Sequence, residues 1–153
     1  MHDLQTDTGS FDSSQLEEYL FGAVINNPDK YFELAEKHGI SADCFQAKLH
    51  RDAWCFLKER FQHGEELNPA LLHANHQKTV ESVGGLTALI GWALKNCPDE
   101  HYFHHNIAKG IVDKHTRRTA LGELENIREA LVSGETISGC QTLFEKAILA
   151  NQN

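Results

Sequence analysis

The feature that most constrains this chain is the spacing of its apolar residues, which recur every three or four positions in segment after segment. The first such segment carries apolar side chains at positions i, i+3, i+4, i+7 and i+8, namely Leu16, Tyr19, Leu20, Ala23 and Val24. This spacing puts them on one face of an amphipathic helix, whereas a half-buried strand would alternate strictly. The pattern therefore predicts a helix that buries this face in a core.

Signals for helix ends separate the periodic segments. The tetrapeptide Ser14-Gln15-Leu16-Glu17 has the pattern of a capping box, and Pro28 and Pro69 suit the first position of a following helix. Gly39 and Gly64 are placed to end helices as C-terminal caps. These signals predict a series of short helices joined by tight turns.

Two more segments complete the predicted helical body. The first runs from Lys48 to His63, and the residues expected to face inward are Leu49, Ala53, Trp54, Leu57 and Phe61. The second, Leu86 to Leu94, follows Val83-Gly84-Gly85 and is poor in β-branched residues, which favours a short buried helix over a strand. The sequence contains no Asn-Gly or Asp-Gly hairpin signal. The prediction is an all-α fold, with about six helices in residues 14–98.

A long helix is predicted after this body. Between Asp99 and about Ser133 there is no proline, and the two glycines are Gly110 and Gly122. Residues 113–119 include no large apolar side chain, which indicates a helix that leaves the body and buries its far end elsewhere. We expect a flexible tail over residues 1–13, the globular body over 14–98, and a helical hairpin over 99–150 within the same domain.

The hairpin is predicted from a second capping box, Ser138-Gly139-Cys140-Gln141, which opens a last helix. Two helices joined by a short connection lie antiparallel. Their apolar side chains are too numerous to stay in water, so we expect them to be buried within the hairpin and against a partner. The predicted interface residues are Leu121, Leu124, Ile127, Leu131, Leu143, Phe144 and Ile148.

Charge and composition limit the possible environments and partners. The net charge is −8, which makes strong direct binding to nucleic-acid phosphates an unlikely role for this chain. No run approaches the roughly 18 apolar residues of a membrane span, and the first residues lack the pattern of a signal peptide. The four cysteines are far apart and include no CxxC pair, so we expect them to be reduced. We therefore expect a cytoplasmic location.

The stretch NCPDEHYFHHN, Asn96 to Asn106, is the strongest candidate for a chemical site. His101 and His105 are four residues apart, and paired histidines at this spacing can bind zinc, with Cys97 nearby. The glutamate of an HExxH motif is absent, and no set of four ligands is recognisable. Pro98 with two acidic neighbours is instead typical of a helix start. We predict no metal site and no cofactor.

Other catalytic patterns are also weak. His73 and His76 form a second pair without a recognisable third ligand or base, and Cys55 and Cys97 have apolar neighbours typical of inert core thiols. A phosphate-binding GxxxxGK[ST] motif is missing from the sequence. We therefore expect no catalytic residues and no ATP hydrolysis by this chain.

Three blocks of sequence carry a resemblance to a known family. They are LEEYLFGAVINNPD (Leu16 to Asp29), DCFQAKLHRDAWCFLKERFQHGEELN (Asp43 to Asn68) and ESVGGLTALIGWALKNCP (Glu81 to Pro98), followed by the pair Ile111-Val112. In this order they resemble the N-terminal domain of bacterial replicative DNA helicases of the DnaB type, over about residues 14–150. The block from VGG to NCP is the most specific.

The resemblance implies a non-catalytic, all-α module with a globular body and a projecting helical hairpin. In that family the hairpins of two subunits pair, three pairs build the collar of a hexamer, and the collar docks the helicase-binding domain of the primase and can contact loaders. The ATPase motor would lie beyond Asn153. The alternative is a free-standing protein of the same fold that regulates replication by binding helicase or primase. A reading frame that continues past Asn153 would favour the first hypothesis, and a stop codon there the second.

Overall fold

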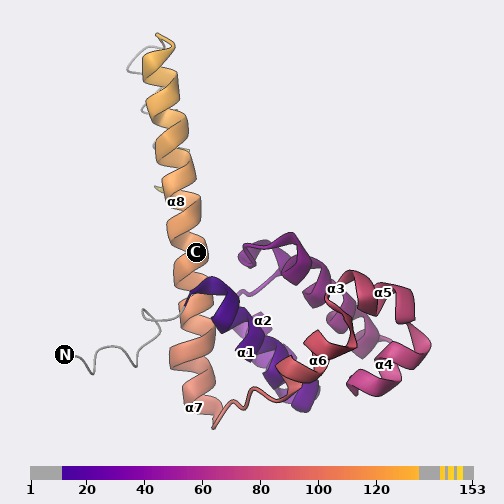
Figure 1. Cartoon of the computed structure of the whole chain (residues 1–153). Coiled ribbons are helices and arrows are strands. Elements are labelled where there is room, and N and C mark those ends of the chain that lie inside the picture. Colours follow the sequence, from indigo (N-terminus) through magenta and orange to yellow (C-terminus); the bar gives the residue numbers. More distant parts are fainter. Residues whose placement is uncertain (1–11, 135–141, 144, 147, 150–153) are drawn as a thin grey trace, which may run out of the picture. The chain divides into compact units, whose positions relative to one another are not determined.

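The computed structural model describes residues 12–134 together with 142, 143, 145, 146, 148 and 149 (Figure 1). These residues contain helices and turns but no strand, which confirms the predicted all-α class. The described residues divide into two compact units, the first ending at Val112 and the second beginning at Asp113. None of the described helices is both long enough and apolar enough to cross a membrane.

The elements follow one another with short connections. In chain order they are α1 (Ser13–Asn26), α2 (Pro28–Lys37), the 3₁₀ turn η3 (Ala42–Cys44), α3 (Lys48–Gln62), α4 (Pro69–Asn75), α5 (Gln77–Ser82), α6 (Gly85–Ala93), α7 (Glu100–Tyr102), the π-helical η4 (Phe103–Ala108) and α8 (Lys109–Val132).

The first helix begins two residues earlier than its sequence pattern predicts. Asp12, not Ser14, is the N-cap: its Oδ1 accepts the backbone N–H of Gln15 at 2.8 Å, and Gln15 Oε1 accepts the N–H of Asp12 at 3.0 Å. The prediction of Ser14 as the cap is wrong because Asp12 and Gln15 form the same reciprocal box two residues earlier. The predicted caps at Gly39 and Gly64 are confirmed, since both have φ of +77° at the ends of α2 and α3.

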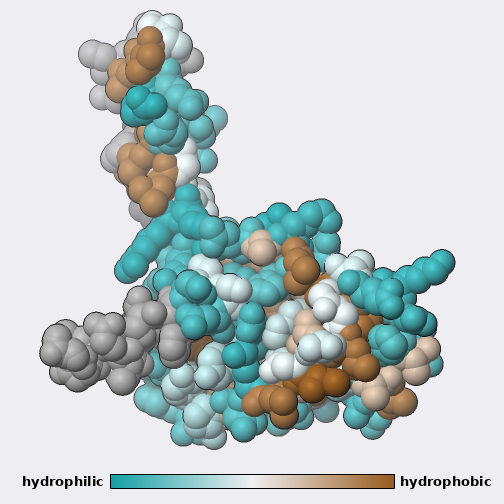
Figure 2. Space-filling model, in the orientation of Figure 1, coloured by the Kyte–Doolittle hydropathy of each residue, from teal (hydrophilic) through white to brown (hydrophobic). Residues whose placement is uncertain are grey.

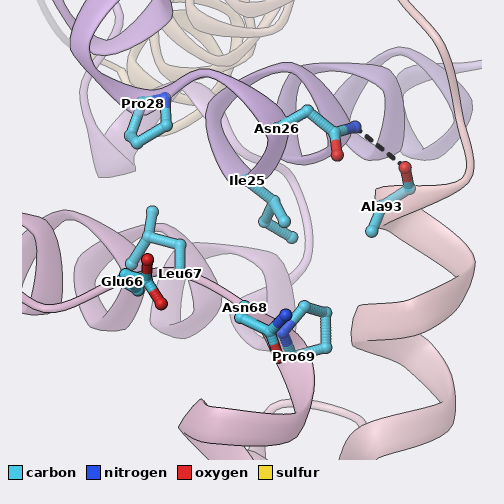
Figure 3. A pocket seen from close by; sticks show the side chains of 8 residues that line it. All are labelled: Ile25, Asn26, Pro28, Glu66, Leu67, Asn68, Pro69 and Ala93. Atoms are coloured by element: carbon cyan, nitrogen blue, oxygen red, sulfur yellow. Dashed lines mark hydrogen bonds between the residues drawn. The ribbon is translucent and has the colours of Figure 1, made fainter.

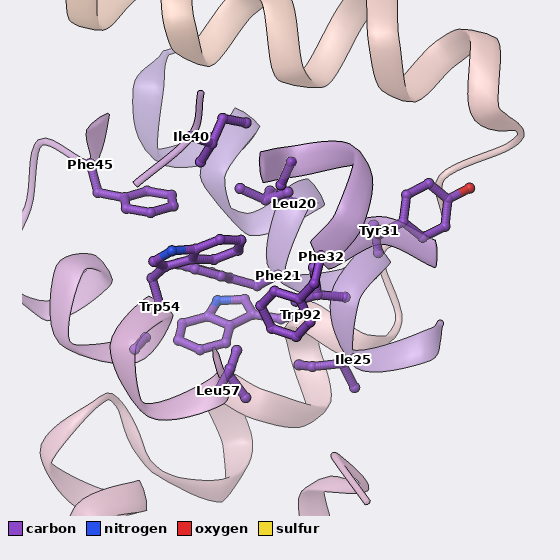
Figure 4. Close-up of a cluster of buried hydrophobic side chains, with 14 of the residues drawn as sticks. Leu20, Phe21, Ile25, Tyr31, Phe32, Ile40, Phe45, Trp54, Leu57 and Trp92 are labelled. Carbon is purple, nitrogen blue, oxygen red and sulfur yellow. The ribbon is translucent and has the colours of Figure 1, made fainter. Parts of the chain in front are cut away.

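Aromatic side chains build the core of the first unit (Figure 4). Phe21 on α1 is fully buried, with its ring centroid 4.7 Å from that of Trp92 on α6 and 5.5 Å from that of Phe45. Phe32 on α2 lies 5.1 Å from the ring of Trp54 on α3. Truncating a buried phenylalanine typically costs about 3–5 kcal/mol of stability, so these contacts hold α1, α2, α3 and α6 together.

Helix α1 approaches the end of α6 closely. A Cβ atom added to Gly22 would lie 2.5 Å from the carbonyl oxygen of Lys95 and closer still to that of Trp92. Asn26, one turn further along α1, donates its side-chain N–H to the carbonyl of Ala93 at 2.8 Å. Only glycine at position 22 allows the two backbones to pack at this distance.

Some residues that were expected inside lie at the surface. Leu49 is 41% exposed, contrary to its predicted inward position on α3. On α6 the side chains of Leu89 and Trp92 are buried, but Ile90 is 44% exposed and Leu94 is 73% exposed, so the prediction of a fully buried helix is wrong. Consecutive apolar residues point to every side of a helix, but the small body packs against only one side of α6. The apolar residues on the other sides therefore stay exposed. Helix α5 was not predicted, because its six polar-rich residues are too few to show periodicity.

Residues after Pro98 still belong to the first unit, which continues to Val112. Phe103, Ile107 and Ile111 are almost fully buried in its core. The single long helix expected from Asp99 is interrupted by η4, in which the wider π turn rotates the following residues relative to a regular α-helix. Helix α8 then runs for 24 residues.

Candidate interaction surface

One face of α8 carries leucine side chains that the described structure leaves exposed. Leu121 is 66% exposed, Leu124 48% and Leu131 53%. Their spacings of three and seven residues place them on the same side of the helix, and we call them the leucine face. Ala130, which is 8% exposed, points away from it. Figure 2 shows apolar side chains gathered along this helix between polar ones. Exposed apolar stripes of this kind mark surfaces that bind other apolar surfaces.

The other predicted interface residues have varied positions. Ile127 on α8 and Leu143 are half-buried, and Ile148 is 43% exposed. Phe144 lies outside the described residues. The predicted seam between α8 and the segment around Leu143 therefore stays a prediction.

Charged side chains lie on and beside the leucine face. Arg128 donates to both carboxylate oxygens of Glu125, with the shortest distance 2.8 Å, and this contact raises the pKa of the guanidinium further. Both side chains are more than half exposed, so the pair contributes little to stability. Charged and apolar side chains therefore share this side of α8.

A shallow pocket of about 390 Å³ opens in the first unit where α1 ends and α4 begins (Figure 3). Ile25 and Leu67 contribute buried apolar side chains, and Asn68 uses its Oδ1 to cap α4. Glu66 is the only ionisable side chain among the lining residues, which are Ile25, Asn26, Pro28, Glu66, Leu67, Asn68, Pro69 and Ala93. The pocket can accept an apolar group, but its lining offers no pairing of a nucleophile with a base.

The histidine-rich stretch forms packing contacts and hydrogen bonds. The rings of His101 and His105 lie 4.3 Å apart, and His104 Nδ1 lies 2.6 Å from His38 Nε2 at the end of α2. Asp99 caps the segment by accepting the N–H of Tyr102 at 2.8 Å. In the part of the chain that the structure describes, no group of three or more histidine, cysteine, aspartate or glutamate side chains is placed to hold a metal ion.

The thiol in this stretch is poorly suited to nucleophilic attack. Burial raises the pKa of Cys97, and its Sγ donates to the backbone carbonyl of Asp99 at 3.2 Å. Burial, helped by a hydrogen bond with Cys97, also raises the pKa of Tyr31 to about 12. Both groups therefore stay protonated at neutral pH, and a nucleophilic cysteine needs the opposite shift.

Only His76 of the second histidine pair takes part in a structural network. His76 Nε2 lies 2.8 Å from Glu65 Oε1, and Arg60 donates to Glu65 Oε2 at 2.6 Å. The hydrogen bond from His76, followed by the charge of Arg60, lowers the pKa of Glu65. This network joins the end of α3 to the start of α5, whereas His73 takes no part in it.

A buried polar pair escaped the sequence analysis. Glu17 on α1 is 1% exposed and His50 on α3 is 6% exposed, and Glu17 Oε1 lies 2.6 Å from His50 Nδ1. The signal for Glu17 was present, because it precedes Phe21 by four residues and Val24 by seven, so that it occupies the core face of α1. Its partner could not be identified from spacing.

Comparisons with other proteins leave the family open. No protein-family model matches the chain, and no curated protein is similar enough to be counted as a relative. The resemblance to the helicase domain therefore rests on the three sequence blocks alone.

Proposed function

We propose that this chain is the non-catalytic N-terminal domain of a DnaB-type replicative DNA helicase, and that it acts in assembly of the hexamer and in docking of primase or a loader. The observation that carries the proposal is the leucine face of α8, which follows a compact all-α unit in the order that the family resemblance implies. A helix with leucines about half exposed or more is suited to pairing with a second copy.

The chemistry of the described residues supports a binding role over catalysis. The candidate thiol has a raised pKa, and His38, His76 and His104 contact another histidine, a glutamate or an aromatic ring. The sequence lacks a Walker A motif. In this proposal ATP hydrolysis belongs to a separate motor domain.

The first test is the absolute mass of the purified chain by light scattering after gel filtration, alone and mixed with the helicase-binding domain of the primase from the same organism. We expect a dimer or a larger ring alone, and a heavier complex on mixing. A monomer whose mass is unchanged on mixing with the primase domain would contradict the proposal.

A pair of variants tests whether the leucine face is responsible. Leu124→Asp puts a charge into the expected interface, where an unpaired carboxylate costs several kcal/mol. Asn126→Asp adds the same charge to an exposed position of the same helix, away from the leucine face. We expect Leu124→Asp to be monomeric and Asn126→Asp to keep the wild-type mass. Equal masses for both variants would show that the leucine face is not the interface. Phe144→Asp, at another predicted interface residue, would then test the neighbouring segment.

A further inference from the structure

A short contact between two histidines joins segments that are far apart in the sequence. His38 Nε2, at the end of α2, lies 2.6 Å from His104 Nδ1 in η4, and the two residues are 66 positions apart. The other ring nitrogen of His104, Nε2, lies 3.5 Å from Glu100 Oε1. Glu100 is in turn 3.4 Å from Lys30 Nζ on α2. The contact is thus one link in a polar chain that starts and ends on α2.

The hydrogens in this chain can be assigned from the chemistry of the groups. Because an ionised carboxylate only accepts, His104 Nε2 carries the hydrogen that faces Glu100. At 2.6 Å, the two facing nitrogens of His38 and His104 have room for one hydrogen between them. In the neutral pair that hydrogen belongs to His38, whose Nε2–H donates to His104 Nδ1. A pair with one positive charge still has a single hydrogen between the two nitrogens, so the contact exists in both states. With both rings protonated, two N–H groups face each other and the contact is repulsive.

The surroundings of His38 oppose a second proton. Burial lowers the pKa of His38, and the neighbouring His104 and His105 lower it further. The ring of Phe103, which is fully buried, meets His38 edge-on at a centroid distance of 6.3 Å. The charged groups near the pair are Glu100 on α7 and, through it, Lys30 on α2, and neither contacts His38 directly.

We propose that the His38–His104 contact is a pH-sensitive latch that holds η4 against the end of α2 and opens when both rings become protonated. The segment it holds is a π-helix, an element found often at functional positions of helices. Opening would weaken the attachment of η4 to α2, while Phe103 and Ile107 keep the segment packed in the core. This inference goes beyond helicase assembly and holds whether or not that proposed function is right.

The direction of the pH effect follows from proton linkage. In the unfolded chain His38 takes up its proton near the ordinary histidine pKa of about 6.5, and in the folded chain it does so only at lower pH. Between these two pKa values the unfolded state binds more protons, so stability falls as the pH falls through about 6.5. Above that pH the contribution of the latch is fully present.

The test compares the full chain with His38→Gln by urea unfolding between about pH 8 and pH 5, with a chelator present. Glutamine can hydrogen-bond to His104 but does not titrate. On acidification we expect the unfolding equilibrium constant of the wild type to rise about fivefold more than that of His38→Gln, which corresponds to one lost hydrogen bond. His73→Gln, in α4, should keep the wild-type pH dependence. An identical pH dependence in wild type and His38→Gln would overturn the proposal.

Nuclear magnetic resonance of the wild type gives an answer even if the variant does not fold. Long-range ¹H–¹⁵N spectra of the imidazoles should show the His38 ring gaining its proton at a pH below the ordinary histidine pKa, with the signals of Phe103 moving in the same step. Uptake of the proton by His38 at the ordinary histidine pKa, with Phe103 unchanged, would refute the latch.

Discussion

The buried pair of Glu17 and His50 allows the sharpest prediction about the stability of the first unit. Glu17 Oε1 accepts from His50 Nδ1 at 2.6 Å, and Glu17 Oε2 accepts the backbone N–H of Gln46 at 3.3 Å. His50 is enclosed by aromatic rings, with Phe21 at 5.1 Å and Trp92 at 5.8 Å between centroids. The carboxylate thus satisfies two donors that water does not readily reach.

Replacing Glu17 with glutamine keeps the size of the side chain but removes one acceptor. An amide has a single oxygen and no charge, so His50 has to change tautomer and accept from the N–H₂ group if the oxygen accepts the N–H of Gln46. A hydrogen bond to a charged group contributes about 1.5–3 kcal/mol, so we expect Glu17→Gln to lower the free energy of unfolding by about 2 kcal/mol. Glu17→Ala leaves both donors unpaired and should cost about 3–5 kcal/mol, the range for removing one partner of a buried pair.

The assay is urea unfolding at neutral pH, monitored by circular dichroism. For a chain of this length, about 2 kcal/mol corresponds to a loss of about 4–8 °C in Tm. The matched control is Glu18→Gln, the next residue, whose carboxylate pairs with Lys95 at 3.6 Å with both side chains about one-third exposed. Such a surface pair is worth about 0–1 kcal/mol, so Glu18→Gln should be nearly silent. If the free energies of unfolding of Glu17→Gln and Glu18→Gln lie within about 0.5 kcal/mol of each other, the buried carboxylate contributes no more than a surface one and the reasoning is refuted.

Further predictions concern the helix contact, the tyrosine and the histidine-rich stretch. Gly22→Ala should cost at least about 1–3 kcal/mol in urea unfolding, because its Cβ meets backbone atoms, whereas Gly91→Ala has open space and should stabilise α6 by about 0.5–1 kcal/mol. Because the pKa of Tyr31 is raised to about 12, stability should fall between pH 10 and 12, and Tyr31→Phe should reduce this fall; equal slopes would contradict the shift. His101→Ala with His105→Ala should change Tm little; a large loss of Tm, with zinc stabilising only the wild type, would reveal a metal site that we did not predict.

Local patterns in the sequence predicted most of the helices. The apolar stripe of α1, the prolines that open α2 and α4, and the glycines at positions 39 and 64 act over only a few residues, so they could be read without a structure. The cap of α1 was misplaced by two positions, because several polar residues in a row can each form a capping box. Helix α5 escaped notice because six residues are too short for a period to be visible.

Exposure was harder to predict than helix formation. Ile90 and Leu94 belong to an apolar run whose composition favours burial, yet the body reaches only the side of α6 that carries Leu89 and Trp92. Which side is covered depends on the packing of α1 and α4 against α6, and on the absence of a side chain at Gly22 that permits it. The spacing of apolar residues within α6 does not show which of its sides the other helices cover.

The polar contacts of the first unit could not be predicted from the spacing of residues within a helix. Glu17 and His50 are 33 residues apart, and His38 and His104 are 66 apart, so no periodicity within a helix links either pair. What the sequence does contain is the position of each group: Glu17 interrupts the apolar stripe of α1, and His50 precedes Ala53 and Trp54 on the inward face of α3. A buried acid requires hydrogen-bond donors, because burying an unpaired carboxyl group strongly lowers the stability of the fold. A polar residue at a core position is therefore a prediction that a partner exists, and the tertiary structure decides which residue it is.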